Sequence, residues 1–223
     1  MKATRADMLR DIESEVRYTS QLIGRDALSA RVMQAMGEVP REKFVPHNMQ
    51  GAAFENGPLP IGHGQTISQP YIVALMTDLL EPAADHSILE IGTGCGYQTA
   101  ILSRLCATVY TVEVVRELGK AAADRLQSLG YHNIQFLIGN GYAGWNEHAP
   151  YDGIIVTAAA TAIPPALIEQ LRPGGRLVIP VGEQYGHQEL MLVTKDASGA
   201  IHEQSVLGVA FVPLVDAGQE LAT

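Results

Sequence analysis

Apolar residues in the first third of the chain recur at the spacing of one helical face. They predict a helix over residues 5–23 and a second over residues 26–37, each with a single apolar side. The chain then loses this regularity and passes into a loop rich in Gly and Pro at 54–64. A strongly apolar segment beginning near Pro70 is expected to form a buried helix. We therefore expect residues 1–80 to form a helical cap that also carries a substrate and active-site loop.

Residues 81–223 alternate between apolar strands and amphipathic helices. Strands that are apolar throughout are buried on both faces, which predicts a mostly parallel sheet with helices on both sides. The fold class is therefore α/β and Rossmann-like, with seven strands and an antiparallel hairpin at one edge, and the cap joins it in one compact unit. The predicted strands are 87–91, 108–114, 133–139, 151–158, 174–182 and the two arms of 189–215, which turn at 196–199; the helices between them are 97–105, 116–130 and 163–171.

Composition narrows the classes of function. The 223 residues carry a formal net charge of −9, and Lys and Arg form no basic run. Because nucleic-acid binding depends on neutralising phosphates, we expect no nucleic-acid partner. The seven His residues have no paired spacing, and Cys95 and Cys106 are the two cysteines. The sequence therefore predicts no metal site and no disulfide framework.

The chain carries no predicted targeting or membrane segment. Its N-terminus is charged from the start, so we expect no signal peptide. No apolar run approaches the ~18 residues of a transmembrane helix. We therefore expect a cytoplasmic protein without a membrane partner, as a monomer or weak oligomer.

Residues 64–70 have the sequence GQTISQP and lie directly before the predicted apolar helix; we call this segment the polar loop. In one interpretation, Ser68 or Gln69 caps that helix and Pro70 occupies its first turn. In the other, the Ser68 hydroxyl faces a pocket and contacts a substrate. These residues alone do not exclude either interpretation.

The strongest chemical motif is a glycine-rich turn between the first predicted strand and the next helix. Open α/β sheets bind ligands at this place, and glycines let a ligand approach the backbone. Glu113 ends the second strand about 20 residues later, where a carboxylate can accept the hydroxyls of a ribose. Glu90, directly before the glycine-rich turn, is a second acid. Two carboxylates near the turn would repel a pyrophosphate but would attract the cationic S-adenosylmethionine, so we expect this cofactor in preference to NAD. The candidate cofactor-binding residues of this motif are Glu90, Gly92, Thr93, Gly94, Cys95, Gly96 and Glu113.

Asn140 and Gly141 follow the third predicted strand, at the same edge of the sheet. The Asn140 amide can accept a hydrogen bond from an adenine amino group and donate one to a ring nitrogen. The alternative is a plain Asn-Gly turn. We add both residues to the candidate cofactor site.

Together these motifs resemble the protein-L-isoaspartate O-methyltransferase family, from about residue 20 to residue 215. The resemblance rests on GQTISQP combined with EIGTGCGYQTA, and on VYTVEV, YDGIIVTAAA, LRPGGRLVIPVG and VAFVPL in the family's order. It implies a class I methyltransferase fold that uses S-adenosylmethionine to repair damaged proteins. The α-carboxylate of an L-isoaspartyl residue, or a D-aspartyl side chain, is methylated. The ester closes to a succinimide, and its hydrolysis returns some normal aspartate.

The resemblance also implies roles for individual residues. Ser68 falls on the active-site serine, Thr66, Ile67 and Tyr71 line the cofactor side, and Glu113 holds the ribose. A carboxylate with a pKa of about 4 is already ionised at neutral pH and needs no general base. We therefore expect catalysis by positioning, with the Ser68 hydroxyl orienting one carboxylate oxygen.

Three positions depart from the family's pattern. Cys95 stands where serine is commoner, Asn140 where aspartate is usual, and Ala160 where TAAP is usual. A neutral acceptor makes a weaker hydrogen bond than a carboxylate, so Asn140 bears on cofactor affinity. Because direct methyl transfer needs no covalent enzyme intermediate, we interpret Cys95 as a small loop residue rather than a nucleophile.

Selection of isoaspartate over aspartate must be geometric, because both present a carboxylate. We expect LPIG (59–62) and VAFVPL (209–214) to form the walls of a groove for an extended peptide. Two alternatives remain: a cofactor-binding adaptor without turnover, and a methyltransferase for a small molecule or RNA. The retained polar residues disfavour the first, and the acidic charge and the TISQP sequence disfavour the second.

Overall fold

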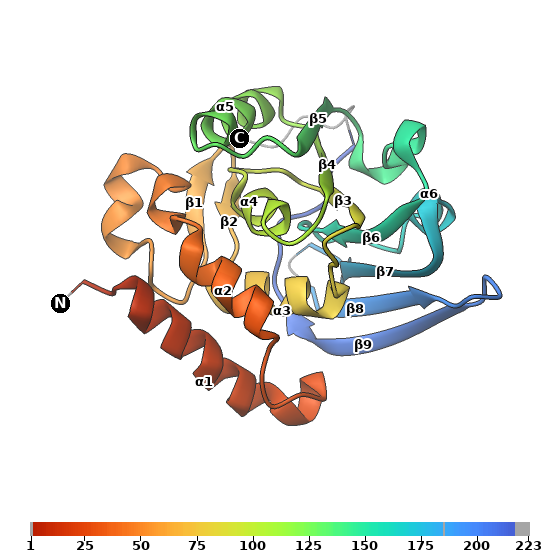
Figure 1. The fold of residues 1–223 in the computed structure, drawn as a ribbon, viewed down its shortest axis with the longest axis horizontal. Helices are drawn as coiled ribbons and strands as arrows, with labels where there is room; N and C mark the ends of the chain where they lie inside the picture. The colour runs from red at the N-terminus through yellow and green to blue at the C-terminus, as the bar shows by residue number, and fades with distance from the viewer. Residues whose placement is uncertain (1, 185, 217–223) are drawn as a thin grey trace.

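The computed structural model describes residues 2–184 and 186–216, and its centre is a seven-stranded sheet (Figure 1). The strand order is β5-β4-β3-β6-β7-β8-β9; the first five of these strands are parallel, and the last two pair antiparallel. The prediction of a mostly parallel sheet with an antiparallel closing hairpin is confirmed. The strands are β3 (Ser87–Ile91), β4 (Thr108–Glu113), β5 (Ile134–Ile138), β6 (Tyr151–Val156), β7 (Leu171–Gly182), β8 (Gln188–Lys195) and β9 (Ile201–Val209).

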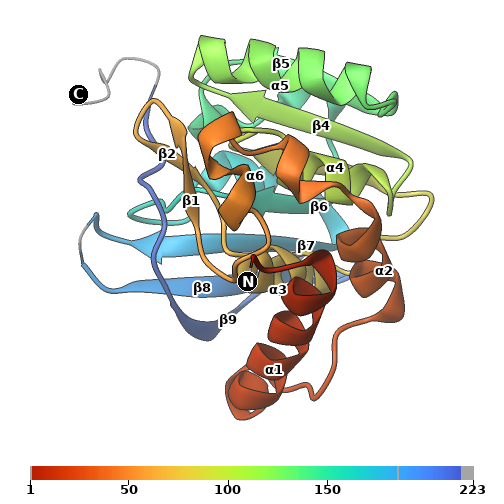
Figure 2. The ribbon, with the colours of Figure 1, turned by 90° about the vertical axis from the view of Figure 1, so that its left-hand side faces the viewer.

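The sheet separates two apolar cores because successive strand residues face opposite sides. On β3, Ile88 belongs to the core that also contains residues of α4 (Tyr97–Ser103) and α5 (Arg116–Ser128). Leu89 belongs to the opposite core, beneath α6 (Pro165–Gln170). Helices therefore cover both faces, as predicted (Figure 2).

Three helices of the N-terminal part share the first of these cores. They are α1 (Arg5–Ile23), α2 (Ala30–Glu38) and α3 (Pro70–Leu80), with α1 outermost in Figure 1. The prediction for α1 is confirmed, whereas α2 begins later than predicted because the Ser29 side chain accepts a hydrogen bond from the Val32 N–H and caps it. Among the described residues, no helix is long and apolar enough to cross a bilayer.

Two strands in the N-terminal part were not predicted. β1 (Leu59–Gly62) and β2 (Gln65–Ile67) pair antiparallel within the segment that we expected to be an irregular loop. Their connection holds Gly62, His63 and Gly64 at positive φ. Two glycines make that tight reversal inexpensive, and they are the same residues that predicted a loop. Two short 3-10 turns, η1 (Arg41–Lys43) and η2 (His47–Ala52), precede this hairpin.

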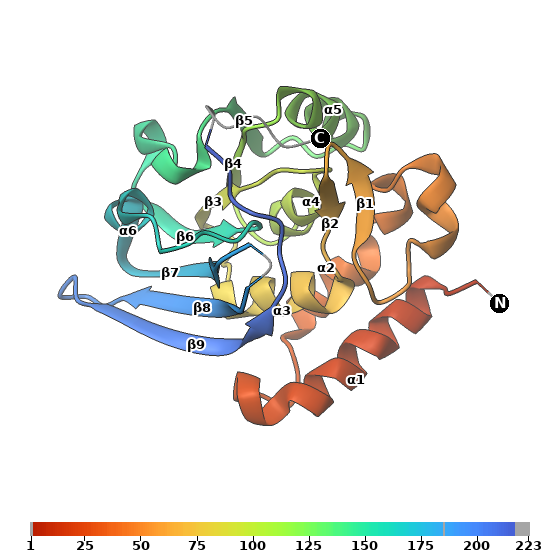
Figure 3. The same ribbon diagram turned by 180° about the vertical axis from the view of Figure 1, so that it is seen from behind.

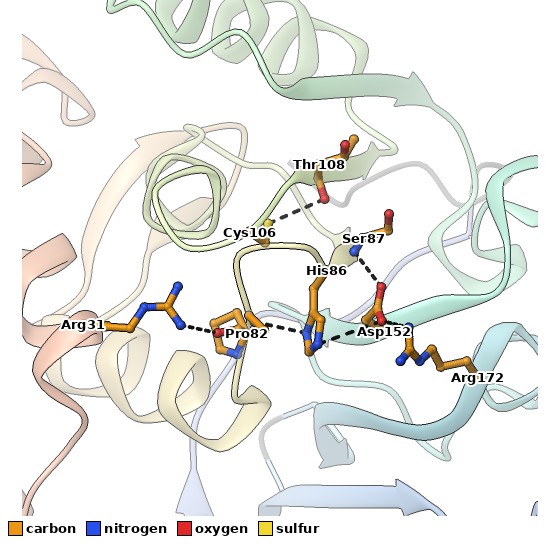
Figure 4. Close-up of polar contacts among 9 residues, drawn as sticks. Arg31, Pro82, His86, Ser87, Cys106, Thr108, Asp152 and Arg172 are labelled. Carbon is orange, nitrogen blue, oxygen red and sulfur yellow. Dashed lines mark hydrogen bonds and ion pairs between the residues drawn. The ribbon is translucent and has the colours of Figure 1, made fainter. Parts of the chain in front are cut away.

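Polar contacts fix the amino ends of β3 and β6, far from the glycine turn (Figure 4). Asp152 Oδ2 accepts a hydrogen bond from the Ser87 N–H at 2.7 Å and its carboxylate pairs with Arg172, while His86 Nδ1 accepts from the Ala83 N–H at 3.1 Å. Cys106 lies nearby, and burial raises the pKa of its thiol to about 12. These contacts hold the central strands in register at the end of the sheet opposite the candidate site.

The chain beyond β9 crosses the carboxyl ends of the central strands. Figure 3 shows this blue segment passing β6, β3 and β4 toward β5. It is held by hydrogen bonds from the Ala159 N–H to Val212 O at 2.8 Å and from the Leu214 N–H to Ala159 O at 2.7 Å. The Tyr142 hydroxyl also donates to Leu214 O at 3.0 Å. The segment therefore covers the edge of the sheet where the glycine turn lies.

Candidate functional site

A first cavity opens at the carboxyl ends of β3, β4, β5 and β6. The chain runs from β3 outward to β4 on one side, while β6 lies on the other, so this is the switch point where α/β sheets bind ligands. Its lining combines the glycine turn with the polar loop and the segment after β9. The lining residues are Gln65–Ser68, Val73, Ile91–Cys95, Tyr97, Gln98, Val112–Val115, Gly141, Thr157, Ala158 and Val212–Val215.

Gly92 is the residue of the turn at which a side chain is least tolerable. Its φ is +95°, and a Cβ atom there would lie 2.4 Å from Thr157 Oγ1. That hydroxyl donates to Gly92 O at 2.7 Å, so the end of β6 holds the end of β3 directly. The glycine is therefore required both by its backbone conformation and by this close approach.

Glu113 supplies the carboxylate of the first cavity. Its Oε2 accepts a hydrogen bond from the Gly94 N–H at 2.7 Å, and its Oε1 accepts from the Val115 N–H at 3.0 Å. Each oxygen keeps a free lone pair, so the carboxylate can accept two further hydrogen bonds from a diol. Glu113 therefore fixes the glycine turn and presents acceptors to the cavity at the same time.

Two other residues of the turn have different surroundings. Gly96 does not line the cavity: its φ is +87°, and a Cβ atom there would lie 2.8 Å from Leu126 of α5, so it permits helix packing. Cys95 does line the cavity and is buried. Burial raises the pKa of its thiol, which opposes formation of a thiolate nucleophile. This agrees with our interpretation of Cys95 as a small loop residue.

Glu90 does not line the first cavity. Because neighbours on a strand face opposite sides, Ile91 faces the first cavity and Glu90 points toward α4. Its side chain is 0% exposed, and Oε2 accepts hydrogen bonds from Thr99 and Thr111, both at 2.6 Å. Burial raises the pKa of Glu90 to about 8, so the carboxyl is mostly protonated at neutral pH. The expectation of two carboxylates facing a cationic cofactor is thereby corrected: the negative charge at the cavity comes from Glu113.

A second cavity adjoins the first along the polar loop. Its walls include residues 186–188 and 208–212. Four residues line both cavities and so mark their junction: Thr66, Ser68, Thr157 and Val212.

Ser68 does not cap α3. The helix begins at Pro70, and Gln69, the residue before it, makes no capping hydrogen bond with its side chain. Ser68 is half-buried, and within the part of the chain that the structure describes its backbone oxygen accepts a hydrogen bond from Arg41 whereas its hydroxyl makes none. A free hydroxyl at the junction of two cavities matches the chemical interpretation rather than the capping one.

The two segments expected to form a peptide groove lie apart from each other with respect to the second cavity. Residues 209–212 line it and 59–62 do not; Leu59 pairs with Ile67 in the β1–β2 hairpin. Leu214 lines the first cavity instead. Leu59 is therefore withdrawn as a wall of the groove.

Tyr71 is not brought to the first cavity. Its hydroxyl lies 2.6 Å from Thr19 Oγ1 of α1, and because Thr19 donates to Glu15 O, the tyrosine is the donor. The side chain therefore connects α3 to α1, while Thr66 and Ile67 line the first cavity. Thr66 and Ile67 lie in β2, whereas Tyr71 lies in α3.

Asn140 lies beside the first cavity, and Gly141 lines it. Asn140 Oδ1 accepts a hydrogen bond from the Tyr142 N–H at 2.9 Å, and Nδ2 donates to Asp216 Oδ1 at 2.7 Å. The amide therefore forms an Asn turn and holds a carboxylate from the end of the described chain. The structure therefore shows the turn alternative for Asn140, and the contact with an adenine stays a prediction.

Several lining residues were missed by the sequence analysis. Thr157 is a polar residue at the end of an apolar strand, which is a usable signal at the carboxyl edge of a parallel sheet. Residues 212–214 were expected only as part of a peptide groove. Their place beside the glycine turn gives no local signal, because they are apolar and distant from that turn in sequence. Within residues 2–184 and 186–216, no group of three or more His, Cys, Asp or Glu side chains could hold a metal ion.

Sequence comparisons agree on one family. The family model described as Protein-L-isoaspartate(D-aspartate) O-methyltransferase (PCMT) matches residues 18–219. The chain is 55% identical to protein-L-isoaspartate O-methyltransferase 2 of Syntrophobacter fumaroxidans over 212 residues, covering 95% of this chain and 86% of that protein. It is 56% identical to protein-L-isoaspartate O-methyltransferase 2 of a Polaromonas species over 207 residues, covering 93% and 98%.

Solved structures show the same fold. A protein-L-isoaspartate O-methyltransferase matches with a TM-score of 0.81 at 26% identity, covering 96% of this chain and 67% of that chain. A Plasmodium falciparum protein described as a protein-L-isoaspartate O-methyltransferase, in complex with S-adenosyl-L-homocysteine, matches with a TM-score of 0.73 at 24% identity, covering 92% and 97%. The class I, Rossmann-like architecture is therefore shared with these proteins.

Proposed function

The chain belongs to the protein-L-isoaspartate(D-aspartate) O-methyltransferase family, and from this premise we propose that methyl transfer takes place where its two cavities meet, with Ser68 holding the acceptor carboxylate. It is an S-adenosylmethionine-dependent enzyme that repairs isoaspartyl damage in proteins. The cofactor supplies an electrophilic methyl group bound to a cationic sulfur.

One observation carries the proposal: Ser68 lines both cavities, and among the described residues its backbone oxygen accepts a hydrogen bond while its hydroxyl makes none. A methyl donor and an acceptor must approach each other from opposite sides of one point. The first cavity suits the donor, since the glycine turn allows close approach and Glu113 offers acceptors to a ribose. The second cavity then receives the damaged peptide.

The residues at the junction can act by positioning. An isoaspartyl carboxylate with a pKa of about 4 is ionised on arrival, so no residue has to remove a proton. The Ser68 hydroxyl donates one hydrogen bond to an oxygen of that carboxylate and aligns it, while the apolar Val212 helps to exclude water. A single neutral donor orients the oxygen without the strong pairing that a cation would impose.

We assign the cofactor end of the site to residues that line the first cavity. Glu113 takes the ribose, Gly92 and Gly94 permit close approach, and Gly141 lies beside the Asn140–Asp216 pair at the far edge. The Glu113 carboxylate also favours a ligand that carries positive charge. For the peptide, the segment 208–212 offers backbone along the second cavity, which suits an extended chain.

The proposal extends to the setting of the protein. We place it in the cytoplasm, acting on proteins rather than nucleic acids, as a monomer or weak oligomer. The net charge of −9 opposes phosphate backbones, and the two cysteines are both free and buried.

Ser68→Ala is expected to lower kcat by about 10- to 100-fold, because the variant loses the hydrogen bond that orients the acceptor carboxylate. The cofactor Kd should stay unchanged, because the hydroxyl serves the acceptor. The assay mixes enzyme and labelled cofactor with an isoaspartyl peptide or its aspartyl twin, and scores base-labile label. Ser198→Ala, at the β8–β9 turn, is the control. Label on neither peptide with the wild-type protein would favour the adaptor, and a wild-type rate from Ser68→Ala would remove Ser68 from the site.

Glu113→Ala is expected to raise the Kd of S-adenosylhomocysteine by about 10-fold or more, because charge-assisted hydrogen bonds are lost. Titration calorimetry measures it. Glu117→Ala, exposed on α5 four positions later, should bind like the wild type. An unchanged Kd for Glu113→Ala would take this residue out of the ribose site.

A further inference from the structure

Arg41 is a buried cation without an acidic partner. It begins η1 and is 0% exposed, and no ion pair among the described residues includes it. Burial lowers the pKa of the Arg41 guanidinium, but an arginine side chain keeps its proton in proteins. Burying such a charge without a carboxylate is costly, so other contacts must hold it in place.

The guanidinium binds backbone carbonyl groups on both sides of the β1–β2 hairpin. Nε donates to Ala53 O at 2.9 Å, before the hairpin, and Nη2 donates to Ser68 O at 2.8 Å, directly after it. A weaker contact at 3.5 Å joins Nη2 to Gly57 O. The planar fork of an arginine fixes both directions at once, which a lysine ammonium cannot do. Arg41 therefore sets the backbone position of Ser68.

The same guanidinium also contacts the cofactor side. Its central carbon lies 4.8 Å from the centre of the Tyr97 ring, within the range of a cation–π contact. Tyr97 is fully buried, begins α4 directly after the glycine turn and lines the first cavity. One side chain thus spans the distance between the serine of the polar loop and the turn that would hold the cofactor.

We infer that Arg41 is a positioning residue for methyl transfer: it holds Ser68 at a fixed place relative to the first cavity. The inference rests on the proposed role of Ser68. Arg41 reaches neither cavity, so it acts through the serine and not by contact with a substrate. Small displacements of an orienting group are costly in rate, because alignment of the reacting atoms is the main contribution here.

The test is Arg41→Lys, which keeps the charge and loses the fork. We expect kcat to fall by about tenfold while the cofactor Kd changes by less than about threefold, since the hydroxyl is displaced and the glycine turn remains. Calorimetric titration with S-adenosylhomocysteine counts folded sites, and kcat is expressed per site. Arg31→Lys is the matched control, because Arg31 also donates to two carbonyl groups, which are Pro82 O (Figure 4) and Leu105 O. Arg31 lines neither the first nor the second cavity. It should retain the wild-type kcat.

A double-mutant cycle with Ser68→Ala separates positioning from general loosening of the fold. If Arg41 acts through the serine hydroxyl, Arg41→Lys costs no further rate in the Ser68→Ala background. Additive losses would overturn the inference and leave the role of Ser68 intact. A wild-type rate from Ser68→Ala alone would instead refute the proposed role of Ser68, and the inference with it.

A second variant covers the case in which lysine does not fold. Arg41→Gln removes the charge but keeps a planar amide that can donate to the Ser68 carbonyl. It is expected to bind the cofactor and to show the same lack of additivity with Ser68→Ala. If neither variant binds S-adenosylhomocysteine, Arg41 serves the fold as a whole, and a specific positioning role is overturned.

Discussion

Gly92→Ala is expected to raise the Kd of S-adenosylhomocysteine more than about 100-fold, which corresponds to about 2.7 kcal/mol. Two effects combine in this result. A φ of +95° strains an alanine, at a cost on the order of 1–3 kcal/mol. The new Cβ atom would also lie 2.4 Å from Thr157 Oγ1, so the end of β6 or the glycine turn must move. Either movement changes the floor of the first cavity.

Gly199→Ala separates the two effects. Gly199 lies in the β8–β9 turn with a φ of +89°, and a Cβ atom there would meet nothing within 4 Å. We expect it to lose stability by backbone strain alone and to keep the wild-type Kd. Chemical denaturation gives the stability of each variant, and calorimetry the Kd. Cofactor binding by Gly92→Ala at wild-type strength would show that the turn tolerates a side chain and that the ligand does not approach it closely.

The sheet could be predicted because each strand carries its own signal. Runs such as SILEI and YDGIIV are mostly apolar on both faces, and the helices between them have one apolar side. The local sequence pattern therefore agrees with the environment of each element in the fold. The glycine turn could be predicted for a related reason. Its place between the first strand and the next helix puts it at the carboxyl edge of the sheet in any fold of this class.

Other parts of the site depend on contacts that no local pattern reveals. Glu90 was expected at the cavity from its position beside the glycine turn, but alternation along β3 directs it to α4. The β1–β2 hairpin was hidden by its own glycines, and the contact of Tyr71 with Thr19 joins two helices that are distant in sequence. Arg41 gave no signal as a charged residue in a short irregular segment, yet it is completely buried.

Glu90 also makes the free energy of unfolding depend on pH. A salt-bridged acid destabilises the fold when pH falls, whereas Glu90 destabilises it when pH rises. Its pKa is about 8 in the folded protein and about 4.3 in an unfolded chain. Between these values the folded state holds one proton more than the unfolded state, so the free energy of unfolding falls as pH rises, by up to about 1.4 kcal/mol per pH unit. This stabilising contribution is complete below about pH 4 and is lost as pH rises through about 8.

Glu90→Gln is expected to remove this loss of stability. The amide is neutral at every pH and can still accept hydrogen bonds from Thr99 and Thr111. Relative to the wild type, the variant should gain roughly 3–4 kcal/mol between pH 5 and pH 8, as an upper bound for one proton. Urea denaturation at four pH values measures this difference. Glu117→Gln, which is exposed on α5, should follow the wild-type curve.

Glu90→Gln also tests whether the buried carboxyl group affects the glycine turn through hydrogen bonds. Because Thr111 donates to Glu90, Thr93 of the glycine turn must donate to Thr111, across 2.7 Å. The neutral amide introduced by Glu90→Gln can accept from Thr111 and preserves this order of donors, so cofactor binding at pH 7 should survive the substitution while the pH slope disappears. Parallel stability curves for Glu90→Gln and the wild type would mean that the carboxyl is ionised inside the folded protein. The first cavity would then be backed by two negative charges, and the Kd of the cationic cofactor should rise in the variant.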